Sequence, residues 1–523
     1  IYAMSNYNTI TSLSESPKKK GMIYAGTDDG LLQLTENGGK SWRRIPVDSL
    51  GVPGTAFIND VKADLFDEKT VYVALDNHKY GDYTPYLVKS TDKGKTWMRI
   101  TNGIPDKHLV WRIVQDHINP RLLFLGTEFG LFVSLDGGFN WTEMNGGMPT
   151  ISLRDLVIQK REDDLVAASF GRGFFVLDDY SALRMLSQLM LERESVLFEP
   201  RKGYWYVERP VIDFDDRPGS LGSQLYLADN PPFGVNFTYY LKDAYKSRKE
   251  LRQEKEKDVQ GNIDFPGWNR LEIEERQTLP YVFVEIKDME GNIVRRVRAT
   301  NKAGFHRVNW DLRVASRRPI SEADRVNAVA MMAAPGSYKA QLYKYVSGEV
   351  APISDEISFE TVPLYQGSLA GIPKAGVAQF WRDYERIETE VTLFELRLNE
   401  ALNNYDQLWI AIHRSNVDVN MLELLLKAKP MLSRVDMYWN GYKTKNQVGE
   451  KNAPNVKLWL SAIQRGIERS TYGPTDTHRQ MVGWIQSALQ EKNNELDAAV
   501  LEMDTVYGLM KEAGGPVIKG LEK

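Results

Sequence analysis

Cysteine is absent from the 523 residues of this chain. Its absence excludes disulfide frameworks, thiolate nucleophiles and cysteine–zinc sites. Histidine is scarce, with six residues, which leaves little for a histidine-rich metal centre, and the sequence has no P-loop or dinucleotide fingerprint, so we expect neither a metal nor a cofactor. No stretch approaches the roughly 18 consecutive apolar residues of a membrane-spanning helix. The 66 basic and 70 acidic residues give a net charge of −4, which argues against nucleic acid as a partner.

The length is too great for one compact domain and predicts about three, at roughly 150 residues each. The first residue is Ile1, and no charged-then-apolar signal segment follows it. We therefore expect this sequence to be the C-terminal part of a longer chain. The 12 tryptophans and 25 tyrosines favour aromatic-packed β structure.

Three octapeptides repeat one pattern, Ser/Thr-x-Asp/Asn-x-Gly-x-Ser/Thr/Asn-Trp. They are Thr35–Trp42, Ser90–Trp97 and Ser134–Trp141. Their spacing is close to the roughly 40–50 residues of a four-stranded propeller blade. The Asp or Asn side chain can accept hydrogen bonds from turn N–H groups, and the Trp supplies an apolar plate between sheets. We therefore predict structural roles for the acidic or amide position and for the tryptophan of each octapeptide, namely Asn37, Trp42, Asp92, Trp97, Asp136 and Trp141.

These octapeptides resemble the Asp-box (BNR) repeats of sialidases, xyloglucanase-type glycosidases and the sortilin family. The segment from Leu153 to Asp179, which lacks a box, is similar to the closing blade of bacterial sortilin-like proteins commonly labelled glycosyl hydrolase. Later segments around Trp310 and Tyr338 resemble the tail of the same family. The resemblance implies an extracytoplasmic bacterial protein, whether secreted, periplasmic or on the cell surface. It also implies further propeller blades upstream, on the same or a separate chain.

The predicted fold class is multidomain, mainly β and then α. Residues 1–182 are expected to form part of a β-propeller, with three Asp-box blades and a closing blade. Residues 183–199 are a connector, and 200–365 an immunoglobulin-like β-sandwich. A charged segment, 242–275, is interpreted as a solvated helical insertion, with a docking arm as the alternative. Apolar residues at helical spacing, such as Phe380, Tyr384 and Ile387, predict a helical bundle over 375–523.

If the first strand of each blade lies innermost, its start and the turn between the second and third strands share one face. The boxes then lie on the opposite face. Residues predicted on the first face for binding are Asp60, His78, Tyr80, Asp82, Trp111, Arg112, Arg154 and Arg172, with Asn6 and Tyr7 beside them. The long loop 76–86 is the segment favoured for contact with a partner.

Two functions follow from this face. The favoured one is binding of a protein, peptide or glycan partner in the propeller channel, because no complete catalytic constellation is visible. The alternative is a glycoside hydrolase, which needs two carboxylates roughly 5–10 Å apart. Asp28 or Asp29 could form that pair with Glu128 if the first and third blades face each other. The sequence leaves open whether the protein is an enzyme.

Overall fold

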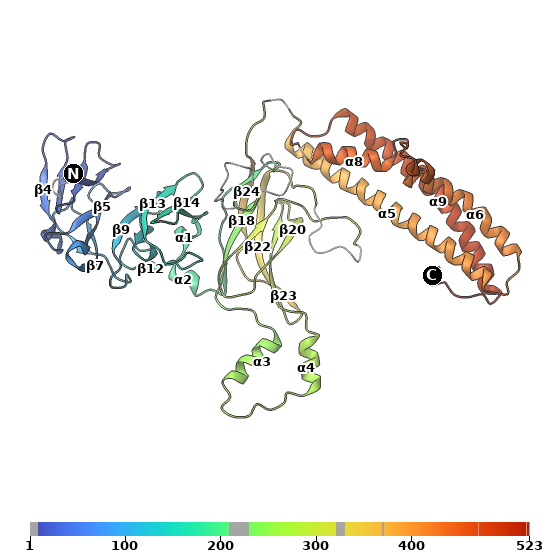
Figure 1. The fold of residues 1–523 in the computed structure, drawn as a ribbon, viewed down its shortest axis with the longest axis horizontal. Coiled ribbons are helices and arrows are strands. Elements are labelled where there is room, and N and C mark those ends of the chain that lie inside the picture. Colours follow the sequence, from blue (N-terminus) through green and yellow to red (C-terminus); the bar gives the residue numbers. More distant parts are fainter. Residues whose placement is uncertain are drawn as a thin grey trace.

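The computed structural model describes residues 9–208, 230–320, 330–368, 371–468, 470–518 and 520–521. The molecule is elongated, with small sheets toward the N-terminal end, larger sheets in the middle and long helices toward the C-terminal end (Figure 1). The chain is therefore mainly β and then helical, as the sequence predicts. Residues 1–8 and 209–229 of the predicted propeller and sandwich lie outside the described residues.

The N-terminal part contains three four-stranded antiparallel sheets and one three-stranded sheet. The first sheet has β1 (Ile10–Glu15), β2 (Ile23–Thr27), β3 (Leu31–Thr35) and β4 (Arg43–Pro46). The second has β5 (Phe57–Ala63), β6 (Val71–Asn77), β7 (Asp82–Ser90) and β8 (Met98–Arg99). The third has β9 (Val110–Gln115), β10 (Leu123–Thr127), β11 (Gly130–Ser134) and β12 (Thr142–Glu143). The fourth has β13 (Leu153–Gln159), β14 (Asp164–Ser169) and β15 (Phe174–Leu177).

Successive sheets pack through their apolar faces, and their first strands are neighbours. β1 contacts β5, β5 contacts β9 and β9 contacts β13. Side chains also join these strands: the Val61 N–H donates to the Ser12 hydroxyl at 2.8 Å, and the Ile113 N–H donates to Asp60 at 3.0 Å. Separate buried clusters lie between the first and second, second and third, and third and fourth sheets. Each fully buried Val, Leu or Phe contributes roughly 1.5–3 kcal/mol, so this packing sets the order of the sheets.

Two short helices, α1 (Ala182–Met185) and α2 (Gln188–Leu191), connect the fourth sheet to the central sheets. Arg184 of α1 forms ion pairs with Asp116 at 2.8 Å and Asp163 at 2.6 Å. The buried Tyr180 hydroxyl also donates to Asp116, at 2.6 Å. These contacts fasten the connector to the third and fourth sheets.

The central part consists of two sheets that share one apolar core. The smaller has β16 (Ser195–Leu197), β18 (Val235–Leu241) and β21 (Gly304–Trp310). The larger has β17 (Gly203–Trp205), β24 (Ile357–Pro363), β22 (Gly336–Val346), β19 (Tyr281–Lys287) and β20 (Ile293–Ala299), with β23 (Glu349–Pro352) paired to β22. Burial alternates along β18, as expected for a strand with one face in a core. The rings of Phe237 and Phe359 meet between the sheets, with centroids 5.1 Å apart.

A helical arm projects from the central sheets (Figure 1). It consists of α3 (Arg248–Lys257), α4 (Trp268–Glu275) and the loop between them. Ser247 begins α3 with a capping box closed by Glu250. Arg252 of α3 forms ion pairs with Glu256 at 2.7 Å and with Glu274 of α4 at 2.9 Å. The charged residues of this segment therefore hold its two helices together.

The C-terminal part is helical, with α5 (Lys374–His413), α6 (Asn420–Asn440), α7 (Lys443–Gln447), α8 (Val456–Ile467) and α9 (Asp476–Glu512). α5, α6 and α9 pack against one another, and α8 packs on α9. Phe380, Tyr384 and Ile387 are buried on one face of α5, which agrees with their helical spacing. Within the described residues, no helix combines the length and apolarity needed to cross a membrane.

Candidate functional site

On one face of the N-terminal sheets lie the start of each sheet's first strand and the turn between its second and third strands. Antiparallel pairing causes this, because the start of β9 lies beside the end of β10, with Arg112 opposite Gly126. Six of the predicted residues make direct contacts here, in two groups: Arg112 pairs with Asp60, and Trp111 contacts His78, Glu128 and Arg154. Asp82 contacts Asn77 and Tyr86 of its own hairpin instead.

Glu128 of this face accepts hydrogen bonds from three side chains. Its Oε2 is 2.8 Å from the Trp111 indole nitrogen, 3.0 Å from the Ser152 hydroxyl and 3.5 Å from Arg154. The Arg154 guanidinium stacks 3.6 Å from the Trp111 ring centre and 5.3 Å from that of Phe170. We call these five residues the Trp111 cluster: Trp111, Glu128, Ser152, Arg154 and Phe170. Cation–π stacking and the shared carboxylate fix the orientation of the arginine.

Arg112 bridges two sheets on the same face. Its guanidinium lies 3.0 Å from Asp60 of the second sheet and 2.9 Å from Asp155 of the fourth. Burial opposes the positive charge, but the carboxylates of Asp60 and Asp155 raise the pKa of Arg112 above its ordinary value. Asp60 is 4% exposed and also accepts from the Ile113 N–H. Arg112 and Asp60 therefore brace the face and hold its sheets in register.

The loop after β6 adds a histidine and exposed tyrosines. The His78 Nδ1 contacts the carboxylate of Asp76, which is buried, and the imidazole ring lies 6.1 Å from Trp111, edge to face. Tyr80 is 68% exposed. Asp82 accepts hydrogen bonds from the Tyr86 hydroxyl at 2.7 Å and from the Thr84 N–H at 3.0 Å. Burial opposes the negative charge of Asp82, but these bonds lower its pKa. Asp82 therefore shapes the loop, while His78 and Tyr80 are available on its surface.

The remaining predicted residues lie apart from the cluster. Asp28 accepts from the Thr9 N–H at 3.0 Å, and Asp29 accepts from the Thr27 hydroxyl at 2.5 Å. Among the described residues, no hydrogen bond or ion pair joins Asp28 or Asp29 to Glu128. Arg172 lies exposed in the turn between β14 and β15, between Gly171 and Gly173. Asn6 and Tyr7 lie outside the described residues.

The repeated octapeptides form three turns with the same hydrogen bonds. In each, the Ser or Thr hydroxyl donates to the Asn37, Asp92 or Asp136 side chain at 2.8–3.0 Å. The N–H four residues later also donates to that side chain, at 2.9–3.0 Å. Hydrogen bonds from Thr96 lower the pKa of Asp92. Burial opposes the charge of Asp136, but hydrogen bonds from Asn140 still lower the pKa of Asp136. Every acceptor is thus used within its own turn.

The three tryptophans of the octapeptides differ in exposure. Trp141 is 4% exposed and packs in the core shared by the second and third sheets. Trp97 is partly buried against the core of the first and second sheets. Trp42, of the first sheet, is 44% exposed. Each buried tryptophan therefore lies between its own sheet and the preceding one.

Sequence reasoning missed Ser152 and Phe170. Phe170 follows Ser169 at the end of β14 just as Glu128 follows Thr127 at the end of β10. Aligning these two turns would have placed Phe170 on the face. Ser152 precedes β13 without a distinctive pattern, so its role needed the structure. Within the described ranges, no group of three or more His, Asp and Glu could hold a metal ion.

No protein-family model matches the chain. A xyloglucanase of Hypocrea jecorina (strain QM6a) is 27% identical over 143 residues, which are 25% of this chain and 17% of that protein. A GH74 enzyme of Niastella koreensis has a similar structure over 34% of this chain and 29% of its own, with 14% identity and a TM-score of 0.28. The β-propeller domain of Cps50 (Swd1) from Myceliophteria thermophila matches 34% of this chain and 55% of its own, with 17% identity and a TM-score of 0.26.

The matched stretch spans well under two thirds of the xyloglucanase and of the Niastella enzyme. The chain therefore has distant sequence similarity to a xyloglucanase, and its structural neighbours include a β-propeller.

Proposed function

We propose that the face around the Trp111 cluster binds a partner, either a protein or peptide or a glycan. The observation that carries this proposal is that Arg154 lies over the rings of both Trp111 and Phe170. Phe170 is 72% exposed and Arg154 is 42% exposed at its side chain, so both present surface to solvent. Aromatic and arginine side chains held rigid by their neighbours are typical of binding hot spots.

The carboxylates of this face support recognition better than acid catalysis. A glycosidase needs one carboxyl that keeps its proton, usually in an apolar pocket, and a second at a suitable distance. The buried Asp60 is paired with Arg112, and the buried Asp76 with His78. Glu128 accepts hydrogen bonds from Trp111, Ser152 and Arg154, which hold its carboxylate in place. A carboxylate held in this way can accept hydrogen bonds from a ligand.

We also propose an assignment of the domains. We take the four N-terminal sheets as blades of an Asp-box propeller of the sortilin-like type, followed by an immunoglobulin-like sandwich and a helical bundle. The exposed Trp42 supports further blades upstream, on this or another chain, because such a blade would cover it as the second sheet covers Trp141. An extracytoplasmic bacterial location belongs to this proposal.

The test is a binding screen with paired variants. The protein is immobilised and exposed to a peptide library and a glycan array, and hits are measured in solution by calorimetry. Trp111→Ala and Arg154→Ala should weaken binding at least 10-fold, whereas Arg161→Ala, an exposed arginine after β13, should leave it unchanged. Retained affinity in both cluster variants, with a normal melting curve, would disprove this site.

The alternative is a glycoside hydrolase of the Asp-box propeller type, favoured by the similarity to the xyloglucanase. It needs a carboxylate pair in the channel, and Asp28, Asp29 and Glu128 are its candidates. Release of reducing ends from xyloglucan and other polysaccharides is measured for the parent and for Asp28→Asn, Asp29→Asn and Glu128→Gln. Activity abolished by Glu128→Gln and by one aspartate variant favours the enzyme; no release from any polysaccharide favours the binder.

A further inference from the structure

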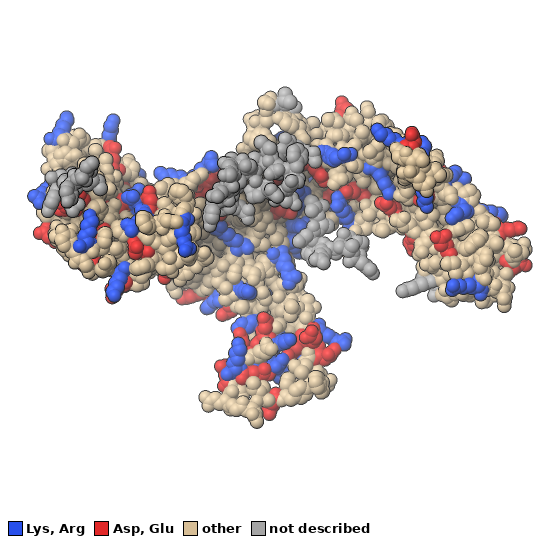
Figure 2. Space-filling model, viewed as in Figure 1, with Lys and Arg blue, Asp and Glu red and all other residues tan. Residues whose placement is uncertain are grey.

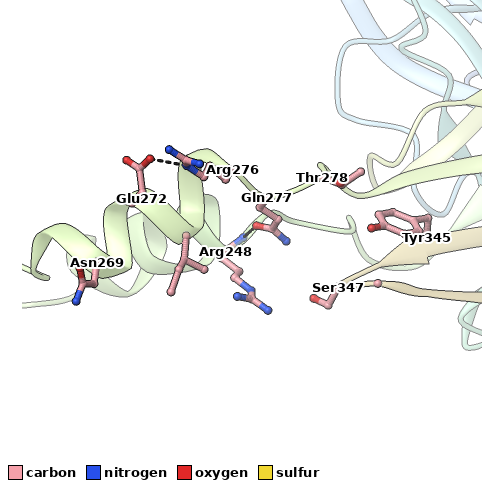
Figure 3. Close-up of a pocket in the computed structure, with 10 residues that line it drawn as sticks. Arg248, Asn269, Glu272, Arg276, Gln277, Thr278, Tyr345 and Ser347 are labelled. Atoms are coloured by element: carbon pink, nitrogen blue, oxygen red, sulfur yellow. Dashed lines mark hydrogen bonds and ion pairs between the residues drawn. The ribbon is translucent and has the colours of Figure 1, made fainter. Parts of the chain in front are cut away.

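A groove of about 670 Å³ lies between the helical arm and the β22–β23 hairpin. This volume is within the range of small-molecule sites, roughly 300–1,000 Å³. Figure 3 shows Arg248 and Gln277 on the arm side and Tyr345 and Ser347 on the hairpin side. The arm projects away from the N-terminal sheets, so this groove is separate from the Trp111 cluster (Figure 1).

The groove carries one net positive charge. Arg276 is neutralised by Glu272, which is 2.5 Å away. The Arg248 guanidinium has no ion pair or hydrogen bond with any described residue and points toward the hairpin (Figure 3). Both signs of charge crowd the rest of the arm (Figure 2), where Arg252 and Glu274 satisfy each other. Among the charged residues that line the groove, Arg276 and Glu272 pair with each other, whereas Arg248 has no acidic partner in the described residues. Arg248 would therefore favour an anionic ligand.

The other lining groups are uncommitted hydrogen-bonding side chains. Gln277 uses its Oε1 to accept from the Arg248 backbone N–H at 2.9 Å, which leaves its amide N–H groups for a ligand. The side chains of Asn269, Thr278 and Ser347 make no hydrogen bond to the described residues. Several amides and hydroxyls around one cation suit a ligand that carries many hydroxyl groups of its own.

Tyr345 provides a ring at the same wall. One face of the ring stacks on Tyr281, with centroids 5.2 Å apart, and the residue also lines the groove. The neighbouring wall is the tight turn Ser347–Gly348, where both residues have positive φ, at 54° and 95°. A turn offers no free strand edge, so an extended peptide could not add to the sheet here. Recognition at this wall therefore depends on side chains and a ring, which favours a sugar over a peptide.

We propose that this groove binds a carboxylate-bearing sugar unit of an acidic glycan, with Arg248 on the carboxylate, Tyr345 beside the sugar ring and Gln277 on its hydroxyls. The site goes beyond the function proposed for the Trp111 cluster. Its ligand is a uronic-acid chain rather than a neutral polysaccharide, because a neutral sugar would leave the charge of Arg248 unused.

The test uses tetragalacturonate as the probe and the full chain as the protein, with affinity measured by calorimetry. Arg248→Ala and Tyr345→Leu should each weaken binding at least 10-fold. Arg248→Ala keeps the backbone hydrogen bond to Gln277, so its fold should be intact, which a melting curve verifies. Lys249→Ala removes the same charge from the next position of α3 and should change the affinity less than twofold. The methyl-esterified tetramer should bind at least 10-fold more weakly than the free acid.

Four results would overturn the proposal. They are no binding of tetragalacturonate at millimolar concentration, an equal loss in Lys249→Ala, equal affinity for the methyl ester, and binding of hexaglutamate in its place with the same dependence on Arg248. Trp111→Ala serves to separate the two sites: it should leave tetragalacturonate binding unchanged, whatever it does to partners of the Trp111 cluster.

Discussion

Arg112 is the side chain that ties the second, third and fourth sheets together near the Trp111 cluster. Its removal would leave the Asp60 carboxylate, 4% exposed, without its cation. We expect Arg112→Ala to lower the free energy of unfolding by roughly 2–4 kcal/mol, somewhat less than the ~3–5 kcal/mol of a fully buried pair. Asp155→Ala should cost under about 1 kcal/mol, because Asp155 is 53% exposed at its side chain.

Urea unfolding of both variants measures this difference. The double variant Asp60→Asn with Arg112→Ala should recover part of the loss, since no buried charge then remains unpaired. Equal costs for Arg112→Ala and Asp155→Ala would contradict the role given to Asp60.

The turn acceptor Asp136 gives a prediction for pH. Because its pKa is lowered in the folded protein, its contribution to stability is complete above the ordinary value of about 4 and is lost as the pH falls below it. Asp136→Ala should cost about 1–3 kcal/mol at pH 7, through the lost bonds from Ser134 and Asn140. Asp136→Asn should cost less, because Asn37 fills the same position in the first turn.

Melting temperatures of the parent and of Asp136→Asn are compared at pH 7 and pH 3. The difference between them should shrink at the lower pH. A gap that widens on acidification would show that the carboxylate has the opposite linkage.

Among the elements, α5 connects the central sheets to the other helices. Leu398 is fully buried on its inner face, so Leu398→Ala should lower the free energy of unfolding by about 2–5 kcal/mol. Leu393 lies on the same helix but is 46% exposed, and Leu393→Ala should change stability by no more than about 0.5 kcal/mol. Thermal unfolding followed by circular dichroism checks both, and similar losses would mean that another surface covers Leu393.

How far the sequence predicts these elements depends on the range of the interactions. The octapeptide turns are predictable because their hydrogen bonds close within four residues, and α5 because Phe380 and Tyr384 repeat at helical spacing. The parallel pairing of β17 with β24 joins residues such as Gly203 and Thr361, for which no local pattern exists. Likewise, the sequence shows that Arg112, Asp60 and Asp155 are charged. It does not show that the two carboxylates share the guanidinium of Arg112.

At the scale of the molecule, each N-terminal sheet packs against the sheet that precedes or follows it in the chain. Trp141 lies between two sheets, so Trp141→Ala should cost about 3–5 kcal/mol. Trp42→Ala should cost less than half of that, because Trp42 is 44% exposed. Denaturant unfolding of the two variants measures the ratio. If Trp42→Ala were as costly as Trp141→Ala, the first sheet would be covered in solution by another copy or another part of the protein.

The length of α5 also sets a distance. With 40 residues at about 1.5 Å each, its two ends are roughly 60 Å apart. Near the first end, Trp381 packs on Trp205 of the central sheets, with ring centroids 5.7 Å apart. The His413 end of α5 therefore lies several nanometres from the central sheets, so the two ends of this helix cannot belong to one binding site.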